Sequence, residues 1–312
     1  RLIQTHASLV FIAPPFVYKI KKPVDFGFLD YSSLEKRRHF CEQELRLNRR
    51  LCPEGYLEVI PITDDQGQLR LRGDGEPVEY ALVMREFSAD GFFDRKVEAG
   101  KATKEDIERI VEKLRGFYLE QKPTAEIEDW GRIDKQRVST GENFDQTEPF
   151  VGRTITPAAF AAIRQFTNRF YEAGSELLRR RVDAGWIRDC HGDLHLEHIH
   201  LTPEHLHIYD CIEFNDRFRF VDVASDVAFL AMDLEYRGAR DLARHFERRM
   251  VEALQDHDMP RLLPFYKCYR ACKAPLRKRT TPFAKRRLSG PRVTFAWRCA
   301  TPSQARNRCS LP

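Results

Sequence analysis

One stretch, residues 187–214, constrains the fold more than any other part of the chain. It holds six of the ten histidines together with Asp193 and Asp210. Polar residues come first, and two short apolar runs follow, 199–201 and 206–209, separated by a Thr-Pro-Glu turn. This order is typical of a loop that leads into a β-hairpin. Such a hairpin would hold a carboxylate in the loop at a fixed separation from a carboxylate beyond the second strand.

Metal-assisted phosphoryl transfer needs two carboxylates placed in this way, one to orient the attacking hydroxyl and one to hold the metal on the phosphates. The sequence His-Gly-Asp-Leu-His at 191–195, followed by Asp210, resembles the catalytic loop and metal-binding aspartate of the aminoglycoside phosphotransferase family. That family is a small-molecule branch of the protein-kinase-like fold. The spacing agrees with the kinase pattern, because His198 is the fifth residue after Asp193 and Asp210 follows twelve residues later.

The resemblance implies an α+β, bilobal protein-kinase-like fold. The N-lobe, 1–86, would be a small antiparallel sheet with one helix, and the C-lobe, 87–272, would be larger and mostly helical. Residues 273–312 would form a basic and irregular tail. The implied activity is transfer of the γ-phosphate of ATP, with Mg²⁺, to a hydroxyl of a small molecule such as a sugar or an aminoglycoside.

The resemblance also assigns roles to the residues of the hairpin region. Asp193 would orient or deprotonate the acceptor hydroxyl, and Asp210 would bind Mg²⁺ with help from His198 or Glu213. The family usually has Asn where this chain has His198. Imidazole is a poorer Mg²⁺ ligand than an amide oxygen and favours softer metals, so Mn²⁺ is an alternative cofactor. Two further histidines are also given roles: His191 would brace the loop, and His195 would contact the acceptor or the metal.

A strand expected near the N-terminus carries two lysines on one face, Lys19 and Lys21. A kinase-like fold needs a lysine here to bind the nucleotide phosphates, and comparison with the V-A-I-K pattern favours Lys21, with Lys19 as the alternative. A helix is expected over 34–51, and Glu44 lies in its apolar stripe. We therefore predict that Glu44, rather than Glu42, holds the phosphate-binding lysine.

Further strands are expected at 56–62, 69–71 and 80–84, followed by a hinge whose backbone would bind adenine. The hinge residues, by resemblance alone, are Arg85, Glu86 and Phe87.

Three other segments carry specific expectations. The Asp-Phe-Gly triplet at 25–27 precedes the catalytic loop, so its aspartate is expected in a loop that leaves the strand. Residues 121–155 are polar and are expected to be irregular, as a lid or binding loop. Asp222 is expected to cap a helix and, by resemblance, to brace the backbone of the catalytic loop.

Composition excludes several classes of protein. No apolar stretch approaches the length of a membrane span. The eight cysteines form no C-x-x-C pair, so they indicate neither a zinc site nor a disulfide framework, and a cytoplasmic protein is expected. Residues 273–312 hold 11 basic residues and no acid, which leaves 41 Lys or Arg against 47 Asp or Glu elsewhere. A mildly acidic body with a basic tail is therefore expected, and nucleic acid would be contacted only through the tail. Some relatives carry an additional P-loop ATPase domain, but the G-x-x-x-x-G-K-[ST] motif does not occur here.

Two other functions fit parts of the sequence. A metal-dependent hydrolase would use His191, Asp193, His195 and His198 to bind Zn²⁺, but it gives Lys21 no purpose. A catalytically inactive relative would bind nucleotide, or RNA through its tail.

Overall fold

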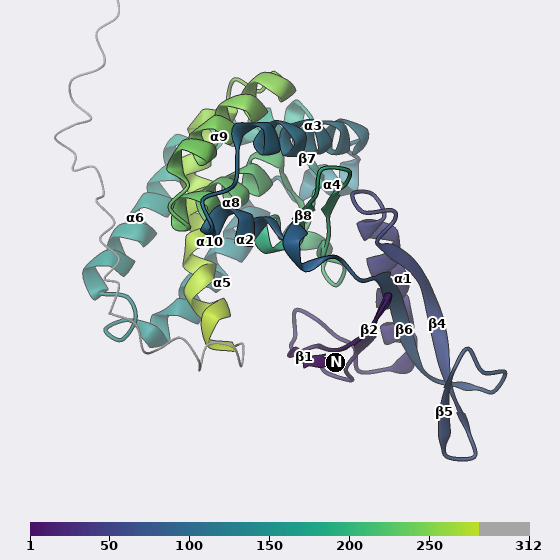
Figure 1. The fold of residues 1–312 in the computed structure, drawn as a ribbon. Coiled ribbons are helices and arrows are strands. Elements are labelled where there is room, and N and C mark those ends of the chain that lie inside the picture. Colours follow the sequence, from purple (N-terminus) through teal and green to yellow (C-terminus); the bar gives the residue numbers. More distant parts are fainter. Residues whose placement is uncertain (281–312) are drawn as a thin grey trace, which may run out of the picture.

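The computed structural model describes residues 1–280, with side chains through residue 271. A curled antiparallel sheet with one helix lies beside a larger, mostly helical part (Figure 1). The six strands of the sheet have the spatial order β1-β2-β3-β6-β4-β5. Their bounds are β1 (Leu2–Gln4), β2 (Ser8–Ala13), β3 (Phe16–Lys21), β4 (Tyr56–Asp65), β5 (Gln68–Leu71) and β6 (Pro77–Arg85). The predicted fold class is confirmed.

The two faces of β3 have different environments. Tyr18 and Ile20 pack against a small apolar cluster that β4 and β6 contribute. Lys19 and Lys21, which alternate with them, face helix α1 (Leu34–Asn48), which packs on β6 and β4. Ser33 caps α1 by accepting a hydrogen bond from the Lys36 N–H. The alternation in the sequence therefore predicts correctly which side of the strand carries the charges.

The helical part is built around α8, in which ten residues are buried. It packs against α9 and α10, and α9 also packs against α3 (Figure 1). A capping box of Thr103 and Asp106 begins α3, as the sequence predicts. The helices are α2 (Phe93–Glu98), α3 (Lys104–Glu120), α4 (Ala125–Asp129), α5 (Ile133–Thr147), α6 (Pro157–Ala173), α7 (Ser175–Asp183), α8 (Val223–Tyr236), α9 (Arg240–Leu254) and α10 (Met259–Thr280). None of the helices in the described part of the chain combines the length and the apolar character that a bilayer crossing requires.

The expected hairpin is present. Strands β8 (Ile199–Leu201) and β9 (Leu206–Ile208) pair antiparallel, with His200 opposite His207. A second short pair, β7 (Ile187–Asp189) and β10 (Phe220–Asp222), closes the region at its base. The loop before β8 and the segment after β9 are thereby held next to each other.

Residues 121–155 differ from the prediction, because they contain α4 and α5 instead of an irregular lid. The buried side chains of α5 are Thr140 and Asn143, both polar, so this helix has no apolar stripe to indicate it in the sequence. Helix α10 also continues to Thr280, past residue 273 where the irregular tail was expected to begin. The rest of that tail, 281–312, lies outside the described residues.

Candidate active site

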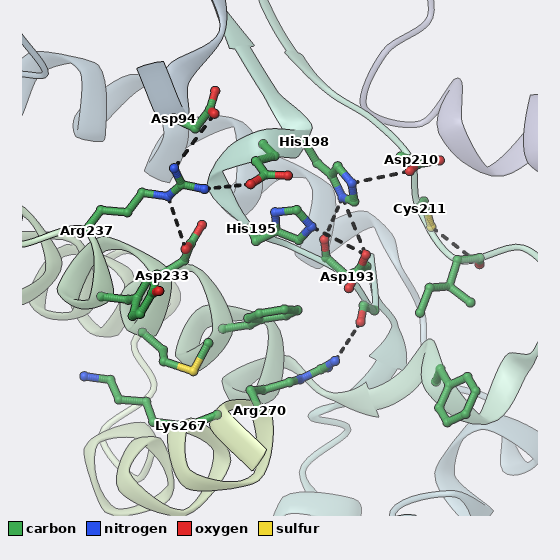
Figure 2. Close-up of a pocket in the computed structure, with 18 of the residues that line it drawn as sticks. Asp94, Asp193, His195, His198, Asp210, Cys211, Asp233, Arg237, Lys267 and Arg270 are labelled. Carbon is green, nitrogen blue, oxygen red and sulfur yellow. Dashed lines mark hydrogen bonds and ion pairs between the residues drawn. The ribbon is translucent and has the colours of Figure 1, made fainter. Parts of the chain in front are cut away.

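The two predicted catalytic carboxylates lie on either side of one histidine ring. His198 Nε2 is 3.3 Å from an Asp210 carboxylate oxygen, and its Nδ1 is 3.8 Å from a carboxylate oxygen of Asp193 (Figure 2). His198 Nδ1 also lies 2.9 Å from the Asp193 carbonyl oxygen. A carbonyl oxygen only accepts, so Nδ1 is the donor. In the neutral ring, Nε2 therefore presents a lone pair toward Asp210.

Asp210 has a backbone conformation that few residues adopt, with φ of 60°. Two hydrogen bonds fix this turn. The Asp210 N–H donates to the Tyr56 hydroxyl at 3.2 Å, and the next residue, Cys211, donates its N–H to the Asn48 side-chain oxygen at 2.8 Å. Strain of this kind persists only where the surroundings enforce it, and it is concentrated at functional sites. The sheet and α1 therefore determine where the Asp210 carboxylate points.

The carboxyl of Asp210 opens into the cleft, with 44% of its side chain exposed. Burial raises its pKa, but the Lys19 ammonium at 3.1 Å, and then His198 when its ring is protonated, outweigh burial and bring the pKa well below its ordinary value. The group is therefore ionised at neutral pH and suited to bind a cation.

The backbone of the loop before Asp193 is held by a residue that the sequence analysis did not identify. Asp226, on α8, accepts hydrogen bonds from the N–H groups of His191 at 2.7 Å and Gly192 at 3.0 Å. The prediction that Asp222 braces this loop is wrong. Asp222 caps α8 as expected, and its carboxylate also pairs with the buried Arg181.

Gly192 is required at its position in the loop. Its φ is 81°, and a Cβ there would lie 2.6 Å from the Phe218 carbonyl oxygen. Its own carbonyl oxygen accepts a hydrogen bond from Arg270 at 2.8 Å. Helices α8 and α10 thus fix the loop from two sides. The positive φ explains the glycine of the His-Gly-Asp sequence.

The two lysines of β3 have different surroundings. Lys19 lines the cleft and donates to Glu44 at 2.7 Å and to Asp210 at 3.1 Å. The side chain of Lys21 is 1% exposed, and its ammonium donates to Glu44 at 2.7 Å and Glu213 at 2.5 Å. The geometry therefore favours Lys19 as the phosphate-binding lysine, although the sequence comparison favoured Lys21. Glu44 holds both.

Glu213 lines the cleft, but its carboxylate is nearly buried and engaged with buried partners. The same carboxylate oxygen accepts hydrogen bonds from Lys21 and from the Tyr31 hydroxyl. Burial lowers the pKa of Lys21, but Glu213 and then Glu44 outweigh burial and raise it well above its ordinary value. This geometry favours a role for Glu213 in holding Lys21 over the predicted role as a metal ligand.

The remaining predicted residues all face the cleft except His191. His195 Nε2 lies 3.6 Å from the Asp193 carboxylate, and its ring centroid is 3.9 Å from that of His198. The ring of Phe87 stacks on His200 and His207. The backbone N–H of Glu86 donates to the Pro15 carbonyl oxygen. Arg85, Glu86 and Phe87 line the cleft, and adenine binding by their backbone stays a prediction.

His191 is fully buried and braces the loop, as its predicted role requires. Its Nε2 donates to the Tyr209 carbonyl oxygen at 2.9 Å, and its Nδ1 accepts from the Asp193 N–H at 3.3 Å. Burial lowers its pKa to about 4, more than the nearby Asp226 raises it.

We expect this histidine to make the fold sensitive to acid. The pKa of His191 in the folded protein is below its ordinary value. The contribution of the neutral imidazole to the free energy of unfolding is therefore complete above about pH 6.5 and is lost as the pH falls toward 4. In metal-free buffer, the free energy of unfolding should fall over this range by about 3 kcal/mol more in the wild type than in His191→Gln. Urea denaturation at a series of pH values measures this. If the free energy of unfolding fell equally steeply with pH in the two proteins, the result would contradict a buried neutral imidazole at His191.

Comparison with known proteins bears on the fold. No protein-family model matches the chain. Uncharacterized proteins of Mycobacterium tuberculosis and Mycobacterium bovis are 30% identical over 268 residues, which cover 86% of this chain and 52% of theirs. The chain thus spans about half the length of the curated relatives it matches.

Among solved structures, choline kinase from Cryptosporidium parvum covers 90% of this chain and 82% of its own, with a TM-score of 0.52 and 9% identity. An aminoglycoside phosphotransferase from Alicyclobacillus acidocaldarius covers 90% and 92%, with a TM-score of 0.41 and 14% identity. The likeness to the choline kinase, together with the sheet and the helical part described above, shows that the chain has the protein-kinase-like fold. This agrees with the fold that the sequence resemblance implied.

Proposed function

We propose that this protein is an ATP-dependent phosphotransferase that acts on a hydroxyl group of a small molecule. One observation carries the proposal. Asp193, Asp210 and Lys19 come from segments far apart in the sequence, yet they line one cleft between the sheet and the helices, and the buried Glu44 holds Lys19 from behind. A catalytic carboxylate, a metal-binding carboxylate and a held cation are the parts that phosphoryl transfer requires.

Each residue has a separate task in this proposal. The Asp193 carboxylate orients the acceptor hydroxyl and accepts its proton as the oxygen attacks the γ-phosphorus, and ADP leaves. Lys19 neutralises phosphate charge while Glu44 keeps its ammonium in place. Because phosphoryl transfer depends mostly on positioning and charge stabilisation, these few groups are sufficient.

The residues around Asp210 fit a divalent cation. The carboxylate of Asp210 and the Nε2 lone pair of His198 are 3.3 Å apart, as two ligands of one ion would be. Asp210 and His198 would hold a Mg²⁺ or Mn²⁺ ion, which would supply positive charge to neutralise the phosphates. One imidazole among the ligands favours Mn²⁺ over Mg²⁺.

A metal-dependent hydrolase remains the second candidate, because ligand atoms of Asp193, His195 and His198 all lie within 4.8 Å of one another. The predicted fourth ligand, His191, has its two ring nitrogens engaged with backbone groups of the loop. The hydrolase also gives the Lys19–Glu44 pair no role. The phosphotransferase accounts for more of the cleft.

ATP turnover tests the proposal. We expect ADP release with Mg²⁺ or Mn²⁺ to depend on an acceptor, over a panel of sugars, amino alcohols and aminoglycosides, and to be lost in Asp210→Ala. The phosphorylated acceptor should be detected by mass spectrometry. Acceptor-independent hydrolysis that needs His195 and stoichiometric Zn²⁺ would instead favour the hydrolase.

The metal preference should depend on His198. We expect the wild type to prefer Mn²⁺ and His198→Asn to shift toward Mg²⁺, so that the ratio of the Mn²⁺ and Mg²⁺ values of kcat/KM falls at least tenfold, a change of about 1.4 kcal/mol. His195→Asn is the matched control, since it makes the same replacement three residues earlier. A changed ratio in the control alone would assign the metal ligand to His195.

A further inference from the structure

A second group of metal-binding side chains lies away from the catalytic cleft. Glu54 belongs to the loop between α1 and β4, whereas His205 and His207 belong to the β8–β9 hairpin. One Glu54 carboxylate oxygen is 3.4 Å from His205 Nδ1 and 3.8 Å from His207 Nε2. One donor atom from each of the three side chains lies within 4.8 Å of the other two.

These separations match those around a tetrahedral ion. Zn²⁺ binds histidine nitrogen at about 2.0–2.1 Å and carboxylate oxygen at about 2.0–2.2 Å, which puts neighbouring donors roughly 3.4 Å apart. We propose that Glu54, His205 and His207 form a divalent transition-metal site, of which Zn²⁺ is the type, with a fourth position open to water. Two imidazoles exclude Mg²⁺ or Ca²⁺ as the preferred ion, because these ions prefer oxygen ligands.

The hairpin holds His205 and His207 in positions suited to binding a metal ion. His207 lies in β9 and His205 directly precedes that strand, and the planes of their two rings differ by only 12°. The His207 ring stacks on Phe87 at 5.0 Å. The backbone N–H of His205 donates to the Thr202 hydroxyl at 3.0 Å. Binding would therefore order mainly the exposed ends of Glu54 and His205, which keep the site accessible to ions.

A metal ion here would join the two parts of the molecule. Glu54 follows α1, the helix that holds Lys19 and Lys21, while the hairpin leads directly to Asp210. Both segments lie against Phe87, because a Cβ on Gly55 would lie 2.8 Å from the Phe87 ring and His207 of the hairpin stacks on the same ring. The ion would fix the loop against the hairpin on the hinge side of the cleft, and so restrain how the two parts move.

Two features limit the affinity. The Nδ1 atom of His207 is buried and has no hydrogen-bond partner within the described part of the chain, whereas metal-bound histidines usually donate from the second nitrogen. Binding must also order Glu54 and His205, whose side chains are 61% and 56% exposed. We therefore expect micromolar rather than nanomolar binding.

Zinc titration of tag-free, chelator-treated full-length protein tests the site, with a chromophoric indicator as competitor. We expect the wild type to bind an equivalent of Zn²⁺ whose affinity falls at least tenfold in both His205→Ala and Glu54→Gln. His39→Ala, which removes an exposed histidine elsewhere, should keep it. His198→Ala should also keep it, which separates this site from the one at Asp193.

Thermal unfolding gives the second measurement. Zn²⁺ should raise the Tm of the wild type and of His198→Ala, but not that of His205→Ala. Unchanged binding in His205→Ala would overturn the site. Binding that is lost in His205→Ala but kept in Glu54→Gln would show an ion held by the hairpin alone, and would overturn the link between the two parts of the fold. Both replaced side chains are exposed, so their replacement leaves the core intact.

Discussion

Asp193→Asn is expected to reduce kcat for phosphoryl transfer by about 10²–10⁴-fold while changing the KM for ATP little. The amide has nearly the shape of the carboxylate, so the loop is preserved, but it no longer accepts the proton of the acceptor hydroxyl. The loop does not depend on the Asp193 carboxylate for its shape, because its backbone is held by Asp226 and by the His191 ring. Steady-state kinetics with an acceptor from the panel measures the effect, and circular dichroism checks the fold.

Asp25→Asn is the control for this prediction. Asp25 stands in the sequence Asp-Phe-Gly, which resembles a metal-binding triplet, but its carboxylate accepts a hydrogen bond from the Gly27 N–H in the loop that leaves β3. Its replacement should leave kcat unchanged. If Asp193→Asn kept wild-type turnover, the site would have been assigned to the wrong loop. Equal losses in the two variants would point to a general effect on the fold.

Much of the site was predictable because it depends on local order in the sequence. The hairpin has a turn between two apolar runs, and a positive-φ glycine followed by an aspartate forms the loop that we propose to be catalytic. The alternation of β3 places both lysines on one face. Each of these features depends on residues that are neighbours in the chain, so it can be predicted from a single sequence.

The other features depend on contacts between distant residues. Asp222 and Asp226 both lie at the start of α8, and only the packing of that helix against the loop decides that Asp226 receives the two N–H groups. Similarly, Lys19 and Lys21 share a face, and their ranking depends on Glu213, which is 192 positions from Lys21. Periodicity can assign residues to a face of a strand, but it cannot distinguish the cleft end of that face from its buried end.

The two lysines should therefore differ in what their loss affects. In Lys19→Met, Lys21 still neutralises Glu44, so the free energy of unfolding should change by no more than about 1 kcal/mol. Turnover should fall at least about 100-fold, because no ammonium then faces the phosphates from β3. In Lys21→Met, two carboxylates lose a buried partner, and the loss of stability should be about 3–5 kcal/mol.

Chemical denaturation and turnover, measured on both variants, separate the two effects. Where Lys21→Met remains folded, Lys19 still faces the cleft, and the variant should keep more activity than Lys19→Met. Arg38→Met, which removes an exposed cation from the outer side of α1, should change neither quantity. The opposite pattern, with turnover lost mainly in Lys21→Met and stability lost mainly in Lys19→Met, would restore Lys21 as the phosphate-binding residue. It would also mean that the sheet must shift along α1 when nucleotide binds, because Lys21 has only 1% of its side chain exposed here.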